Sequence, residues 1–181
     1  MKTLLIGAAA AALLHITPTV VLVKRPDAVS RLLANADRFA SREIHLSGSD
    51  ARRLREATGW EPADGVLTFY LGRRQESITG VLLFVRVDSP HGPTEVAVGF
   101  DPTGAIRGVE VTKATVETKP WVMEALRAGL TDQYRDRGSA PAPDGAAAVK
   151  GRVGTMAQYM AELVDKGVRN ATAAYQLFYR R

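Results

Sequence analysis

The chain has 181 residues, no cysteine and a formal net charge of +5 at pH 7. Without cysteine it cannot form disulfides, thiolate metal sites, iron–sulfur clusters, thiol nucleophiles or covalently attached c-type haem. The positive charge comes from scattered arginines rather than one dense basic run, so anionic lipid headgroups or an acidic redox partner are candidate partners and nucleic acid is not expected.

An apolar, uncharged run occupies residues 3–23 and is flanked on both sides by basic residues. Its densest part, residues 4–14, has the length of the hydrophobic region of a secretory signal peptide. The whole run of 21 residues would span a bilayer of roughly 30 Å as a helix. Pro18 disfavours an unbroken helix and fits a junction between signal peptide and mature chain. A cleaved signal peptide and a retained membrane anchor both stay open, and both place the rest of the chain outside the cytoplasm, in the periplasm or an equivalent compartment.

The first part of the chain after this leader is predicted to contain two helices and a strand. Pro26 fits the first turn of a helix. Ser47 or Ser49 can cap the second helix, and Gly59 can end it. The expected elements are a helix over 26–35, a strand over 42–46 and a helix over 50–58.

From Val66 the apolar residues follow a period of two, which indicates strands. The segment 78–87 is apolar enough to lie at the centre of a sheet, and 95–100 alternates as a half-buried strand does. The expected strands are 66–71, 78–87, 95–100 and 106–112, joined by turns at 72–75, 89–93 and 101–104. Because short turns connect successive strands, we expect an antiparallel meander rather than a parallel doubly wound sheet.

The last third of the chain is predicted to be mainly helical. Pro120 opens a helix over 121–131, and the composition of 138–148 indicates a flexible loop. Apolar residues at helical spacing predict a terminal helix over 155–178 that packs on the core. The expected architecture is α+β, with an antiparallel sheet flanked by N- and C-terminal helices. It forms one domain over residues 24–181 after a leader over residues 1–23.

The familiar catalytic patterns are missing from the sequence. His15, His45 and His91 have no metal-ligand spacing. There is no Walker loop, dinucleotide fingerprint or G-x-S-x-G elbow. Paired carboxylates of the glycosidase type have many candidates and nothing that selects among them. A hydrolase or metalloenzyme is therefore not expected.

Two stretches carry a family resemblance. Ala36-Asp37-Arg38-Phe39 lies between a predicted helix and a predicted strand. The segment 96–118 reads as a strand, an Asp-Pro-Thr-Gly turn, an Ile-Arg-Gly-Val-Glu-Val strand and then Glu117-Thr118. This order resembles the FMN-binding domain family of exported electron-transfer proteins. That family includes flavin-carrying subunits of sodium-pumping quinone reductases and Rnf complexes, and the periplasmic part of NosR-type regulators. The resemblance implies an α+β domain that relays electrons through flavin.

The chain departs from the family at the flavin attachment point. Flavinylated members carry a Ser/Thr-Gly-Ala-Ser/Thr motif before the last helix, where a threonine is esterified by the FMN phosphate. The corresponding stretch here, 150–156, reads Lys-Gly-Arg-Val-Gly-Thr-Met. We therefore expect any FMN to be held noncovalently.

Two groups of residues are candidates for binding FMN. The phosphate group would contact Lys150, Gly151, Arg152, Gly154 and Thr155, because a glycine-bearing bend and a helix N-terminus present backbone N–H groups to an anion. The flavin ring would contact Glu117 and Thr118, which the resemblance places close to it, and Trp121, whose aromatic ring could stack on it. A plain helix start at Thr155 and a core aromatic at Trp121 are the structural alternatives.

Two functions follow from these residues. The first is an exported electron-transfer protein with noncovalent FMN. The second is a flavin-free structural or docking subunit of a membrane electron-transfer complex. The expected partners are a membrane-bound electron-transfer complex or a cytochrome, with anionic lipid headgroups as a further candidate.

Overall fold

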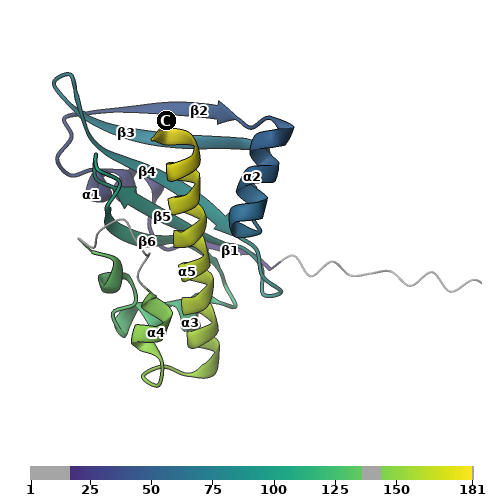
Figure 1. Ribbon diagram of the computed structural model, residues 1–181. Helices are drawn as coiled ribbons and strands as arrows, with labels where there is room; N and C mark the ends of the chain where they lie inside the picture. The colour runs from purple at the N-terminus through teal and green to yellow at the C-terminus, as the bar shows by residue number, and fades with distance from the viewer. Residues whose placement is uncertain (1–16, 136–143, 181) are drawn as a thin grey trace, which may run out of the picture.

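Six antiparallel strands form one sheet, in the order β1-β6-β5-β4-β3-β2, in the computed structural model, which describes residues 17–135 and 144–180 (Figure 1). The strands are β1 (Thr19–Val21), β2 (Arg38–His45), β3 (Val66–Arg74), β4 (Ser77–Val87), β5 (Thr94–Phe100) and β6 (Ile106–Thr115). Each strand from β3 to β6 pairs with the strand before it, so the predicted antiparallel meander is confirmed. The α+β class is confirmed as well.

Helices cover both faces of the sheet. The long helix α5 (Thr155–Ala174) crosses one face and continues as a π-helical turn, Tyr175–Tyr179 (Figure 1). Its residues Met160, Val164 and Val168 are buried in the larger core, as the apolar stripe predicts. The helix α1 (Arg25–Leu32) packs on the opposite face, where Leu32 and Leu33 join a second, smaller core.

The helix α2 (Gly48–Thr58) lies beside α5 and follows the sequence prediction closely. Ser47 is its N-cap and shares a capping box with Asp50, in which each side chain accepts from the other residue's backbone N–H. Gly59 ends it in the left-handed conformation at φ 68°. Capping chemistry depends on neighbours in sequence, and so it could be predicted from sequence.

A buried carboxylate ties α1 to the sheet. Glu95 on β5 accepts two hydrogen bonds from the Arg25 guanidinium and one from the Thr112 hydroxyl at 2.8 Å. Lys113 Nζ lies 3.3 Å from the same carboxylate. Burial acts to raise the pKa of Glu95, but these hydrogen bonds and positive charges outweigh it, and the pKa is lowered.

Several predicted elements differ from the structure. All seven residues of β5 are buried, so the half-buried assignment for 95–100 is wrong, because helices cover both faces of the sheet there. The turn predicted at 72–75 falls later, because β3 extends to Arg74 and Gln75 takes a positive φ of 54°. The predicted loop 138–148 lies partly outside the described residues, and its last part forms the short helix α4 (Gly145–Val149). The predicted helix 121–131 is α3 (Lys119–Arg127), followed by a 3-10 turn, Thr131–Tyr134.

The edge strand β1 was not predicted. Residues 19–21 pair with β6, although the sequence pattern groups them with the leader. Residues 1–16, and with them most of the predicted signal peptide or anchor, lie outside the described residues. Within the described ranges, no helix combines the length and apolar content needed to cross a bilayer.

Candidate functional site

The eight predicted site residues lie at the two ends of the seam between α3 and α5. Glu117 and Thr118 directly precede α3, and Trp121 is in its first turn. Residues 150–154 form the turn between α4 and α5, and Thr155 is the first residue of α5. Both α3 and α4 pack against α5.

Thr118 has a structural role. It is fully buried, and its hydroxyl accepts a hydrogen bond from the backbone N–H of Thr115 at 3.1 Å. The Thr115 hydroxyl accepts one from the N–H of Thr118, also at 3.1 Å. The two hydroxyls lie 2.9 Å apart. This reciprocal pair fixes the exit from β6 into α3 and leaves no exposed hydroxyl for a ligand.

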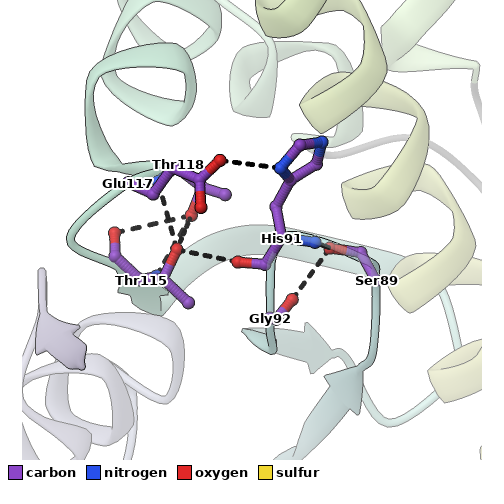
Figure 2. Close-up of polar contacts among 6 residues, drawn as sticks. All are labelled: Ser89, His91, Gly92, Thr115, Glu117 and Thr118. Atoms are coloured by element: carbon purple, nitrogen blue, oxygen red, sulfur yellow. Dashed lines mark hydrogen bonds and ion pairs between the residues drawn. The ribbon is translucent and has the colours of Figure 1, made fainter. Parts of the chain in front are cut away.

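Glu117 forms an ion pair or hydrogen bond with a histidine that was not among the predicted site residues. Its carboxylate contacts Nδ1 of His91 (Figure 2), and the two atoms are 2.8 Å apart. His91 sits in the turn between β4 and β5, which Ser89 closes by donating to the carbonyl of Gly92 at 2.8 Å. The Thr115 hydroxyl donates to the carbonyl of His91 at 3.0 Å and thereby ties the turn to β6.

The His91 ring contacts two aromatic rings. Its centroid lies 5.3 Å from Trp121 on α3 and 5.9 Å from Tyr159 on α5, both in edge-to-face geometry. All three side chains are half-buried. We call His91, Trp121 and Tyr159 the aromatic corner. Its imidazole contacts both of the rings against which a flavin could stack.

The turn before α5 is open to solvent, and the carboxylate of Glu124 already contacts it. Gly151 has φ 75°, and a Cβ built there would meet no heavy atom of the described chain within 4 Å. Arg152 donates to the carbonyl of Ala148 at 2.8 Å. The backbone N–H of Gly154, the N-cap of α5, donates to Oε1 of Glu124 at 2.7 Å. Lys150 and Thr155 are exposed.

The two predicted groups of residues lie along the same contact between α3 and α5. Glu124 is three residues after Trp121 on α3, and Tyr159 is five residues after Gly154 on α5, or about 7.5 Å along the helix. The structure therefore brings the two predicted groups onto neighbouring parts of one surface, with the aromatic corner at one end and the Glu124–Gly154 contact at the other.

A second carboxylate orders the short helix before this turn. Asp165 on α5 is 3% exposed, and its Oδ2 accepts from the backbone N–H of Ala146 at 3.1 Å. Burial raises the pKa of Asp165, against the opposing effects of backbone hydrogen bonds and the charge of Arg169. Asp165 and Lys150 line a cavity of about 380 Å³ beside α4.

Side chains of the chain itself contact both groups that the sequence predicts to bind FMN. His91 contacts Trp121, the aromatic ring predicted to stack on the flavin, and Glu124 accepts a hydrogen bond from Gly154 at the helix N-terminus predicted to bind the phosphate. Two anions at one N–H group repel each other, so the phosphate would have to displace Glu124. In the described ranges, no group of three or more His, Cys, Asp or Glu side chains is arranged to hold a metal ion.

Comparison of the chain with profiles of known protein families, with curated proteins and with solved structures finds no match. The resemblance to the FMN-binding domain family therefore rests on the sequence motifs alone.

Sequence reasoning did not find His91, Glu124 or Tyr159. His91 and Glu117 are 26 residues apart, and Glu124 and Gly154 are 30 apart. Nothing in either spacing marks the pairs. The one available signal was that His91 lies in a turn between two strong strands, where side chains from different elements converge.

Proposed function

We propose that this chain is a flavin-free member of the FMN-binding-domain fold. It acts outside the cytoplasm as a docking subunit for a membrane-bound electron-transfer complex or a cytochrome. The observation that carries the proposal is that His91 contacts Trp121 and Glu124 accepts a hydrogen bond from Gly154, because Trp121 and Gly154 are among the residues predicted to bind the flavin ring and phosphate. The missing attachment motif at 150–156 supports the same conclusion, and the apolar leader supports the location.

The aromatic corner supplies the docking surface. Half-buried aromatic rings bury large apolar area in an interface at little cost in side-chain entropy, and they act as anchors at the centre of protein interfaces. Val116, beside Glu117, is 58% exposed and extends the apolar surface. Glu117 and Lys119 place charges of both signs beside these rings, which suits a polar rim.

The first experiment is a visible absorption spectrum of the full-length protein, purified from a host supplied with riboflavin. We expect no flavin bands, and no quenching of FMN fluorescence when FMN is added at micromolar concentration. Flavin bands at one equivalent per chain would overturn the proposal.

The second experiment measures docking. The tagged chain is isolated from solubilised membranes of its own host, and the haem absorbance that elutes with it is measured. Trp121→Ala should reduce the haem recovered severalfold, while Phe39→Ala should not, because Phe39 is an exposed aromatic on β2, at the far edge of the sheet. Equal recovery with both variants would exclude the aromatic corner as the docking surface.

Noncovalent FMN with an electron-transfer role is the second candidate function. It is favoured by the position of both predicted groups on one seam, with the Gly151 bend open to solvent. It requires His91 and Glu124 to move away. If FMN does bind, Thr155→Ala should leave it largely in place, because no ester bond is involved; complete loss of flavin in that variant would contradict noncovalent binding.

A further inference from the structure

A β-bulge sets one arginine apart from the rest of strand β6. Phe100 on β5 pairs with Ile106, whereas Gly99 pairs with Gly108, so Arg107 is an extra residue in β6 without a partner on β5. Such bulges redirect a side chain and often lie next to functional sites. Here the Arg107 guanidinium lies over the sheet beside Gly80, where a Cβ would be 3.5 Å from its Nη1.

The guanidinium of Arg107 is incompletely satisfied. Its Nη1 is buried, and no hydrogen-bond acceptor within the described residues is in reach. A buried charged donor without an acceptor costs more free energy than most single contacts return. An anion in the adjacent cavity, which Arg107 lines, would offset part of this cost through its negative charge.

Two further arginines converge on the same place from different elements. Arg31 of α1 and Arg135, after the 3-10 turn, line a cavity of about 260 Å³ together with Arg107 and Thr131. Arg31 is held by two hydrogen bonds to Glu110, at 2.7 and 2.9 Å. The lining carries three positive charges and the negative charge of Glu110. Arg135 also pairs with Asp132, whose Oδ1 lies 3.5 Å from its Nη2, and one positive charge remains in excess.

We propose that Arg31, Arg107 and Arg135 form a binding pocket for a phosphate group. Arginine is the residue best suited to phosphate, because its planar fork donates two parallel hydrogen bonds and stays charged at all physiological pH values. The Thr131 hydroxyl adds a neutral donor. The pocket lies away from the seam between α3 and α5, so this inference does not depend on the proposed function.

The phosphate can belong to a small soluble molecule or to the headgroup of an anionic phospholipid. Two probes distinguish these sources. One is inorganic phosphate, and the other is a short-chain phosphatidylglycerol kept below its micelle-forming concentration. Binding of each to the full-length chain is measured by isothermal titration calorimetry at low ionic strength.

We expect saturable one-to-one binding of at least one probe. Arg107→Gln should weaken it about tenfold or more, as the loss of a charge-assisted hydrogen bond predicts. Arg52→Gln is the matched control, because Arg52 is exposed on α2 and far from the pocket, and it should bind like the unaltered chain. Arg135→Gln removes a more exposed member of the pocket and serves if Arg107→Gln fails to fold.

The result either identifies the source of the phosphate group or overturns the proposal that this pocket binds phosphate. Binding of inorganic phosphate indicates a soluble ligand, and binding of the lipid alone indicates a headgroup. No saturable binding of either probe, or equal weakening in the Arg52→Gln control, would overturn the proposal.

Discussion

The carboxylate of Glu124 on α3 accepts a hydrogen bond from the backbone N–H of Gly154, the N-cap residue of α5, at 2.7 Å. In a capping box the side chain at N3 accepts from this N–H, but residue N3 of α5 is Ala157 and cannot. Glu124 thus provides from another helix the negative charge that a helix N-terminus favours. One N–H group of the predicted phosphate site therefore binds a carboxylate of the chain.

Replacing Glu124 tests whether its carboxylate takes the place of a bound phosphate. Glu124→Ala should destabilise the fold by about 0.5–2 kcal/mol, the usual cost of losing a helix cap. It should also let FMN or inorganic phosphate bind at Gly154 more tightly than in the unaltered chain. Denaturant unfolding and fluorescence titration with FMN measure the two effects.

Glu124→Gln is the control, because it keeps an acceptor for the Gly154 N–H and removes the charge. We expect it to be more stable than Glu124→Ala. If neither variant binds FMN or inorganic phosphate more tightly, the Glu124 carboxylate is not what prevents anions from binding at Gly154.

The edge strand β1 should contribute measurably to the stability of the fold. Pro18 accepts a backbone hydrogen bond from Val116 at 2.9 Å, and the N–H of Leu22 donates to Thr112 at 2.9 Å. A chain lacking residues 1–17 keeps these bonds, and one lacking residues 1–23 loses them. We expect the shorter chain to be less stable by about 2–4 kcal/mol, from several backbone hydrogen bonds at roughly 1 kcal/mol each. Equal unfolding midpoints for the two would show that β1 adds nothing to the fold.

The accuracy of the sequence predictions follows from how local each signal is. The helix α2 was predicted nearly residue for residue, because Ser47 and Gly59 are recognisable end signals. The meander followed from short turns between alternating segments. In contrast, β1 has three residues inside an apolar run, and such a strand looks the same as the end of a leader.

The site depended on contacts that no local pattern encodes. The predicted residues do lie along one contact between two helices, but the partners of Glu117 and Gly154 are distant in sequence. His91 is 26 residues from Glu117, and Glu124 is 30 residues from Gly154. Burial of β5 on both faces had the same cause, because each face of a strand is covered by elements distant in sequence, here α1 before it and α5 after it.

Glu95 should make the fold sensitive to acid. Its pKa is lowered in the folded state, where the attraction of Arg25, Thr112 and Lys113 outweighs the effect of burial. A lowered folded pKa contributes stability above the unfolded pKa, and this contribution is lost as the pH falls through the folded value. Glu95→Gln should cost about 1.5–3 kcal/mol at neutral pH, through weakened hydrogen bonds to a charged group, and much less once the pH has fallen through the folded pKa of Glu95. Urea unfolding at a series of pH values measures this, and a pH-independent difference would contradict it.

Asp165 should stabilise the fold at low pH rather than at high pH. Its pKa is raised, chiefly by burial, so its contribution to stability is complete below the unfolded pKa and is lost as the pH rises through the folded pKa. Asp165→Asn keeps an oxygen for the N–H of Ala146 and removes the charge. The variant should therefore gain stability relative to the unaltered chain on going from pH 4 to pH 7, by unfolding measurements at both values. A relative loss over that interval would show that the ionised carboxylate is well satisfied in the fold.

The turn that carries His91 depends on a glycine with no room for a side chain. Gly92 has φ 92°, and a Cβ there would lie 2.5 Å from Cγ2 of Thr115. Gly151 also has a positive φ, of 75°, but it faces open space, so Gly151→Ala meets only the backbone cost of about 1–2 kcal/mol. Gly92→Ala adds a steric clash and should be about 1–3 kcal/mol less stable than Gly151→Ala.

Gly92→Ala should also displace His91 from Glu117, which a shift of the imidazole resonances of His91 in an NMR spectrum would report. Equal stability of the two variants would mean that the turn and Thr115 can move apart freely, and that the aromatic corner is not held by its backbone.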